Sequence, residues 1–234
     1  KMEITQTTET IQEYPDLIVG VKIGHYEDID WSPFERAIEV CEKTRRPLFV
    51  ECHLPQYSLK DQLEHMRPGD IITHSFENIK ERAPFVDPDG KVLKIVLEAQ
   101  KKGVLFDVGH GGAGFWFDQA VPAFKQGFWP NSFGTDLHKF SMNAGMKDML
   151  NIMSKYLAIG MPLKEVLKRG SWFPAQAINR NDLGNLTKGS IADVVLLKIR
   201  EGSFGFVDAG GNRIEGFRKF EAELTIRAGR VVWD

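Results

Sequence analysis

Short apolar runs alternate with amphipathic segments up to residue 136, and this alternation constrains the fold more than any other feature of the chain. Runs rich in β-branched and aromatic residues predict strands at 17–23, 48–52, 70–73, 104–108 and 131–134. Apolar residues at helical spacing predict helices at 33–45, 58–66, 91–102 and 117–125. Because repeated strand–helix units build a parallel sheet covered by helices, this part is predicted to be α/β.

The pattern changes toward the C-terminus. Helical stretches at 146–158, 162–168 and 174–178 are followed by alternating segments at 193–199, 205–208, 221–226 and 230–233, with glycine-rich turns between them. Alternation of apolar and polar residues is typical of antiparallel strands with one buried face. We therefore expect two parts, an α/β unit over residues 1–180 and a small antiparallel β appendage over residues 181–234.

Composition restricts the class of partner. Thirty basic and thirty-two acidic residues give a formal charge of −2, so no strong field favours nucleic acid or an anionic membrane. The apolar runs are far shorter than the roughly 20 residues that span a bilayer. Two cysteines, Cys41 and Cys52, form neither a disulfide framework nor a zinc-ribbon spacing. The expected setting is the cytoplasm and the expected partner is a small molecule.

Polar residues fall at or near the ends of the predicted strands. Lys22 lies in the first strand, His53 and His74 directly follow the second and third, and Asp136 ends the fifth segment. Each residue alone would be ordinary, since a histidine after a strand is usually a hydrogen-bonded loop residue. Because the carboxyl ends of parallel barrel strands open on one face, the set as a whole predicts a shared site.

These residue types suit metal chemistry. Imidazoles and carboxylates are ligands for zinc, and a catalytic zinc site keeps one position open for water. A buried lysine in its neutral form can add CO2, and the resulting carbamate can bridge two metal ions. Bound metal lowers the pKa of water toward about 7. The expected cofactor is therefore a divalent metal, zinc in the first instance, with one or two ions in a complete enzyme.

Several segments carry a resemblance to a known family. They are Val-Gly-Val-Lys at 19–22, Val-Glu-Cys-His at 50–53, Ile-Ile-Thr-His at 71–74, Phe-Asp-Val-Gly-His-Gly at 106–111, Gly-Thr-Asp-Leu-His at 134–138 and the tail at 186–193. From about Asp16 onward the chain resembles the amidohydrolase superfamily, and within it the amidohydrolase/deacetylase metallohydrolases. The resemblance implies strands four to eight of a (β/α)8 barrel over residues 1–180, followed by a small β domain.

The resemblance also implies roles for individual residues. Lys22 corresponds to the carboxylated lysine that bridges two metals, and His53 and His74 to metal ligands. Asp136 corresponds to a metal ligand that also acts as general base and then general acid. His110, with Gly111 and Gly112, would contact the substrate, although the neighbouring glycines also allow a structural turn at this position. His138 is either a neighbour of the metal ligands or the start of a helix.

The sequence also departs from the family pattern. None of its six histidines forms the His-x-His pair that the family carries on its first strand, and strands one to three have no counterpart. We therefore expect about half a barrel and an incomplete site that holds at most one ion, with Lys22 uncarboxylated.

Three functions follow from these observations. The first is a metal-dependent deacetylase that cleaves an amide or ester bond of an acylated small molecule. The second is a cyclic-amide hydrolase of the dihydroorotase kind. The third is an inactive half-barrel, whose unpaired strand edges would favour assembly into a homo-oligomer.

Overall fold

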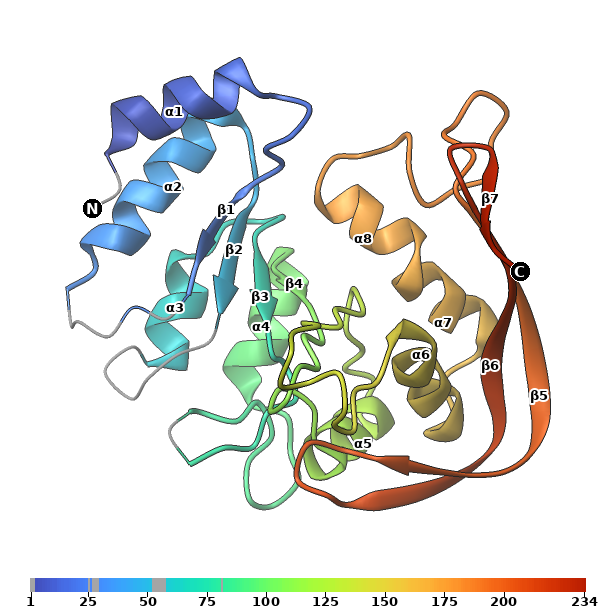
Figure 1. Cartoon of the computed structure of the whole chain (residues 1–234). Helices are drawn as coiled ribbons and strands as arrows, with labels where there is room; N and C mark the ends of the chain where they lie inside the picture. Colours follow the sequence, from blue (N-terminus) through green and yellow to red (C-terminus); the bar gives the residue numbers. More distant parts are fainter. Residues whose placement is uncertain (1–2, 25, 27–29, 52–57, 81) are drawn as a thin grey trace.

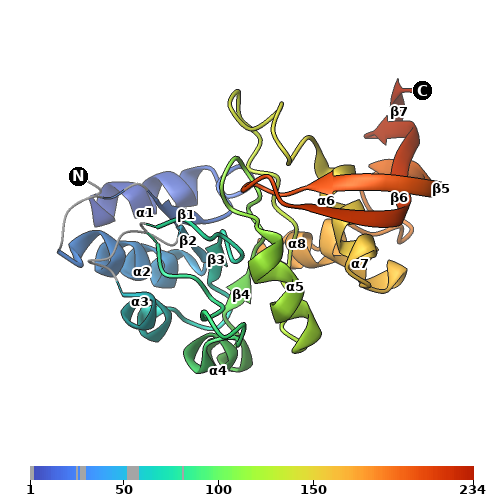
Figure 2. The same ribbon diagram turned by 90° about the horizontal axis from the view of Figure 1, so that it is seen from below.

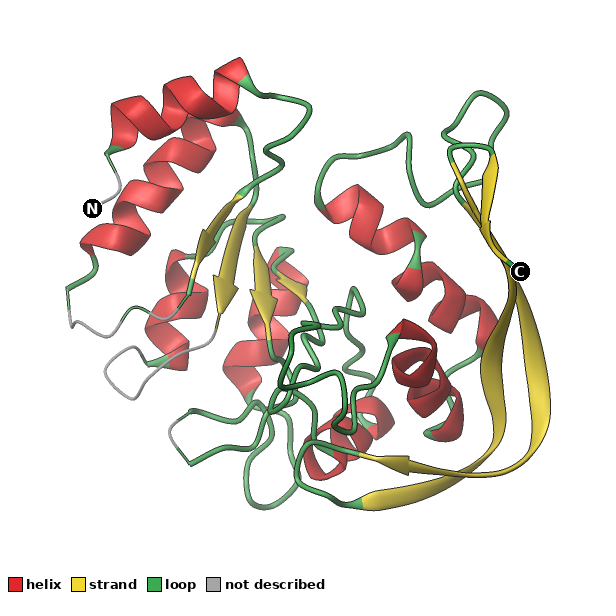
Figure 3. Ribbon diagram, viewed as in Figure 1, coloured by secondary structure: helices red, strands yellow, loops and turns green. Residues whose placement is uncertain are grey.

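A parallel sheet and a separate antiparallel sheet form the framework of the computed structural model, which describes residues 3–24, 26, 30–51, 58–80 and 82–234 (Figures 1 and 3). The parallel sheet has the order β1-β2-β3-β4, with strands Val21–Ile23, Leu48–Glu51, Ile71–Thr73 and Leu105–Phe106. The antiparallel sheet has the order β5-β6-β7, with strands Val194–Val207, Arg213–Arg227 and Arg230–Trp233. The predicted α/β class is confirmed.

Helices alternate with the parallel strands as predicted. Those of the first part are α1 Ile4–Glu13, α2 Ser32–Thr44, α3 Leu59–His65, α4 Lys94–Lys102 and α5 Phe117–Lys125. Three more precede the antiparallel sheet, namely α6 Met149–Ala158, α7 Leu163–Gly170 and α8 Trp172–Ala177. Figure 2 shows α2, α3 and α4 along one side of the parallel sheet. Within the described residues, no helix combines the length and the apolar character needed to cross a bilayer.

Two details of the predicted helices were wrong. Helix α1 was not expected, because its sequence is rich in threonine and glutamate and only Ile11 is buried. The helix predicted at 33–45 begins one residue earlier, because Ser32 lies inside α2 and the N-cap residue is Trp31. The proline that follows still occupies the first turn, where its missing N–H costs nothing.

The predicted fifth strand is present as a strand-like segment beside β4. Ser132 pairs with Asp107 in a parallel bridge, and the His110 amide donates to the Gly134 carbonyl at 2.9 Å. The buried Asp107 carboxylate accepts hydrogen bonds from Thr73 of β3 at 2.8 Å and from Ser132 at 2.6 Å. Asp107 therefore ties three neighbouring chain segments together at the level where the site begins.

The β appendage is more continuous than predicted. The segments expected at 193–199 and 205–208 both belong to β5, which pairs with β6 along its length and carries an irregularity between Glu201 and Phe204. Gly202, which was expected to mark a turn between two strands, lies in this irregularity, and this explains why one strand was predicted as two. The ribbon curves around α6 (Figure 1), and the Phe220 amide donates to the Ser154 hydroxyl of α6 at 2.9 Å.

The parallel sheet is open in the part of the chain that the structure describes. Strand β1 lies at one edge, segment 131–134 lies beside β4, and helices α6 to α8 lie across from β1 and β2 (Figure 1). The interpretation as half of a closed barrel, and the division at residue 180, stay predictions.

Candidate active site

A cavity of about 430 Å³ lies where the parallel strands end. The residues that line it come from five chain segments: Lys22, Glu51, His74, Glu77, Arg82, Gly112, Ala113, Gly114, Asp136 and His138. The structure thus brings Lys22, His74 and Asp136, which the sequence placed on different strands, onto the walls of one cavity. Their action as metal ligands stays a prediction. His53 lies outside the described residues.

His74 is held in a fixed orientation directly after β3. Its backbone has φ of 58°, and its Nδ1 lies 2.6 Å from the carbonyl oxygen of Gly109. Because a carbonyl only accepts hydrogen bonds, Nδ1 carries a proton, so in the neutral ring Nε2 has the lone pair. Nε2 lies 3.5 Å from Oε1 of Glu51. Burial lowers the pKa of His74, but the bonds to Glu51 and to the Gly109 carbonyl outweigh burial and raise the pKa above its usual value.

Glu51 stands at the centre of the charged groups, and sequence analysis gave it no role. Its buried carboxylate lies 3.2 Å from the Lys22 ammonium and 3.6 Å from the Arg82 guanidinium, as well as beside His74. Burial raises its pKa, yet the hydrogen bonds and positive charges of His74 and Lys22 hold the pKa well below its usual range. The available signal was an acidic residue inside an otherwise apolar strand, a position at which glutamate is rarely buried without partners.

Glu77 and Arg82 were also missed. Both lie in the polar stretch after β3, where their charges resemble those of an ordinary solvated loop. Arg82 Nη1 binds Glu77 Oε2 at 2.7 Å, whereas the buried Oε1 has no hydrogen-bond partner in the described structure. Burial raises the pKa of Glu77 to about 7, although the charge of Arg82 acts against the shift.

The donors in the cavity suit a divalent cation. Among the described residues, no three His, Cys, Asp or Glu side chains are close enough to form a metal site by themselves. However, the lone pair of His74 Nε2 faces the ionised Glu51, and two acceptors in this arrangement require a proton or a metal ion between them. A carbamate on Lys22 would also bring a second negative charge close to Glu51, so it too would require cations.

His110 occupies a different place from the one expected. Its ring is fully buried, stacks on Phe115 at 5.0 Å and has Nε2 2.6 Å from the Lys155 ammonium. The ring therefore packs in the core behind the glycine-rich loop at 109–114 and does not line the cavity. Gly112 does line it, and Gly111 lies against Asp136. Substrate binding by His110, Gly111 and Gly112 stays a prediction.

The glycines of the loop differ sharply in the space around them, which allows a matched test. A Cβ at Gly114 would lie 2.1 Å from the Gly109 carbonyl oxygen and 2.6 Å from His74 Nδ1, whereas a Cβ at Gly112 meets nothing within 4 Å. We expect Gly114→Ala to lower the free energy of unfolding by about 1–3 kcal/mol through overpacking. Gly112→Ala should change it by less than about 0.5 kcal/mol. Urea denaturation measures both, and equal losses would contradict the close packing against His74.

Comparison with known proteins shows which proteins this chain resembles. A model of the amidohydrolase family matches residues 120–232. This match and the relatives described next show that the chain is similar to proteins of the amidohydrolase family.

One curated relative is a "Deacetylase" from Brucella anthropi, 29% identical over 219 residues, which cover 92% of this chain and 54% of the relative. The chain therefore spans about half the length of this relative.

Two solved structures resemble the whole chain. One is described as an adenine deaminase and gives a TM-score of 0.93 at 26% identity. The similarity covers 99% of this chain and 64% of the adenine deaminase chain. The other is described as a dihydroorotase and gives a TM-score of 0.84 at 26% identity. The similarity covers 99% of this chain and 63% of the dihydroorotase chain. In both cases the similarity extends through the parallel sheet and the antiparallel ribbon.

Proposed function

We propose that the protein is a metal-dependent hydrolase that removes an acyl group, most simply acetyl, from a small molecule by cleaving an amide or ester bond. The observation that carries the proposal is the single cavity in which His74, Lys22 and Asp136 meet. A relative named as a deacetylase supports the acyl substrate. We also propose that residues 1–180 correspond to strands four to eight of a (β/α)8 barrel, which the similarity to much longer chains supports.

The cavity residues would have two roles, metal binding and proton transfer, and Asp136 would take part in both. His74 and Asp136, with His53, would hold one metal ion, and a carbamate on Lys22 would be needed only to bridge a second ion. A divalent metal bound there would lower the pKa of water toward about 7 and polarise the carbonyl. The Gly109 carbonyl accepts from Nδ1 and so orients the His74 ring and leaves Nε2 as the ligand atom, with the Glu51 carboxylate 3.5 Å from it.

Asp136 is suited to proton transfer because its carboxylate is exposed on the wall of the cavity. It takes a proton from the attacking water as the oxygen bonds to the carbonyl carbon. It then donates that proton to the leaving nitrogen or oxygen as the C–N or C–O bond breaks. The carboxylate ends the cycle in its starting state.

A cyclic-amide hydrolase is the second candidate, favoured by the similarity to the structure titled as a dihydroorotase. Opening a cyclic amide needs the same nucleophile and the same proton transfer, so the residues described above do not separate the two reactions. Only the substrate distinguishes them.

A substrate panel tests the proposal. Full-length protein would be stripped of metal, reloaded with Zn²⁺ and assayed with N-acetyl amino acids, p-nitrophenyl acetate, dihydroorotate and adenine. We expect Zn²⁺-dependent release of acetate, abolished by a chelator and restored by the metal. Turnover of dihydroorotate alone would favour the second candidate. Hydrolysis that is unaffected by metal removal, or no hydrolysis of any compound, would contradict both.

A further inference from the structure

Lys155 in α6 is a fully buried lysine outside the cavity. Within the described residues, no ion pair joins its ammonium to a carboxylate. Its Nζ instead lies 2.6 Å from His110 Nε2 and 2.7 Å from the Gly145 carbonyl oxygen, with the Phe115 ring centroid 5.3 Å away. Burial lowers the pKa of this lysine to about 7. Because a buried amine is costly, its retention calls for a purpose other than packing.

The hydrogen bond from Lys155 to His110 fixes the tautomer of the His110 ring. The other ring nitrogen, Nδ1, lies 3.0 Å from the Gly111 carbonyl oxygen, which can only accept a hydrogen bond. Nδ1 therefore carries the proton, and Nε2 accepts from Lys155. Both contacts require the same neutral tautomer, and burial together with the charge of Lys155 lowers the pKa of His110 to about 3.

This pair stabilises the backbone that lies against Asp136. The amides of His110 and Gly111 donate to the carbonyls of Gly134 and Thr135, each at 2.9 Å. A Cβ at Gly111 would lie only 2.4 Å from Oδ2 of Asp136, so the carboxylate packs directly on the Gly111 backbone. A shift of this backbone would therefore move the carboxylate.

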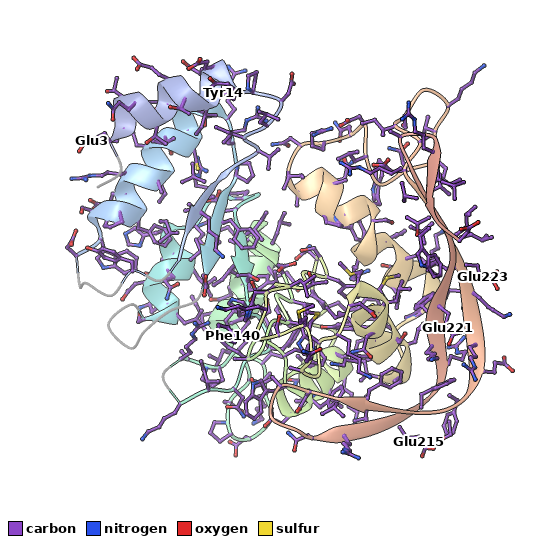
Figure 4. All side chains as sticks on the ribbon, in the orientation of Figure 1. Glu3, Tyr14, Phe140, Glu215, Glu221 and Glu223 are labelled. Carbon is purple, nitrogen blue, oxygen red and sulfur yellow. The ribbon has the colours of Figure 1, made fainter. Side chains whose placement is uncertain are left out.

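The second contact of Lys155 is with the end of the loop that follows Asp136 in the sequence. Gly145 closes the loop that begins after Asp136, and its carbonyl accepts from Lys155 and also from Asn151 at 2.8 Å. The loop carries exposed apolar side chains, including Phe140, which is labelled in Figure 4. One amine thus contacts His110, which precedes the glycine that packs on the carboxylate, and Gly145, which ends the loop that follows Asp136 in the sequence.

We propose that Lys155 is a positioning residue that sets the orientation of the Asp136 carboxylate, acting through His110, next to Gly111, and through Gly145, at the end of the loop that follows Asp136. The inference rests on the proposed role of Asp136 in proton transfer. Lys155 itself does not reach the cavity, so its effect is expected on the rate of the chemical step and not on substrate affinity.

The test compares Lys155→Met with Tyr156→Phe in the full-length, Zn²⁺-loaded protein. Methionine keeps the apolar length and removes both hydrogen bonds. Tyr156 is the adjacent buried residue, and its hydroxyl has no hydrogen-bond partner in the described structure, so phenylalanine is a matched control. With p-nitrophenyl acetate as probe, we expect kcat of Lys155→Met to fall about 100-fold, the cost of misplacing a catalytic group by about 1 Å. KM should change less than about threefold, and Tyr156→Phe should resemble the wild type.

Two further measurements do not depend on activity. The ¹⁵N spectrum of His110 should show protonated Nδ1 and a hydrogen-bonded Nε2 in the wild type, with the Nε2 signal displaced in Lys155→Met. Amide hydrogen exchange at 109–112 and 134–137 should become at least about tenfold faster, while the unfolding midpoint at pH 7 should not fall, because a buried amine has been removed.

The outcomes separate the two proposals. Wild-type exchange and an unchanged His110 signal in Lys155→Met would overturn the positioning role, whatever the activity. A lower unfolding midpoint of Lys155→Met, with kcat and amide protection reduced in proportion, would also overturn the positioning role. Such a result would mean that Lys155 only stabilises the fold. If Asp136→Asn keeps full turnover, the proposed role of Asp136 in proton transfer fails, even where the Lys155 contacts behave as expected.

Discussion

Replacing His74 with alanine is expected to remove metal binding and hydrolysis together. His74 is the ligand candidate whose orientation is fixed from both sides, by the Gly109 carbonyl and by Glu51. Loss of a residue that merely supports a ligand costs about 10–100-fold in metal affinity or activity, so loss of the ligand itself should cost at least about 100-fold. Zinc content after dialysis and the rate of acetate release measure the two effects.

The fold should survive this substitution. Leaving the buried Gly109 carbonyl without its partner costs about 1–3 kcal/mol, a moderate part of the stability of a domain. His65→Ala is the matched control, because that exposed ring stacks on Trp31 at 4.7 Å and is not among the residues that line the cavity. His53→Ala is expected to behave like His74→Ala. Full zinc content and unchanged turnover in folded His74→Ala protein would refute the assignment.

Replacing Asp136 with asparagine is expected to lower kcat by about 10²–10⁴-fold, the contribution of a positioned general acid–base. Asparagine is close in shape and tolerates the left-handed backbone found at this position, where φ is 46°. It cannot take a proton from the attacking water. Steady-state kinetics with the best compound of the substrate panel would measure the loss, and the unfolding midpoint should stay within a few degrees of the wild type.

The exposed Asp89, which lies in the turn before α4, provides the control for Asp136. Asp89→Asn makes the same chemical change away from the cavity and should leave kcat unaltered. If Asp136→Asn matched Asp89→Asn, another group would have to transfer the proton. Glu77 would then be the residue to test, because it lines the same cavity and its pKa is raised to about 7.

The site was only partly predictable from the sequence, as the cavity residues illustrate. Lys22, His74 and Asp136 were found because each lies at or near the end of an apolar run, and the rule for parallel strands places such ends together. Glu51 and Arg82 were missed because their significance depends on partners that come from other segments. Periodicity reports which way a side chain points, but not which charge it will meet.

The sequence by itself determined the α/β class, the order of the strands and helices from β1 to α8, and the change to antiparallel structure near the C-terminus. These features follow from local spacing and turn residues, which act over a few neighbouring positions. Only the tertiary structure decided that His110 turns into the core toward Lys155, which is 45 residues away in the chain. It also decided that β5 continues through the irregularity between Glu201 and Phe204. The physical reason is that burial and hydrogen-bond satisfaction depend on distant segments, and these contacts outweigh local preference once the chain is packed.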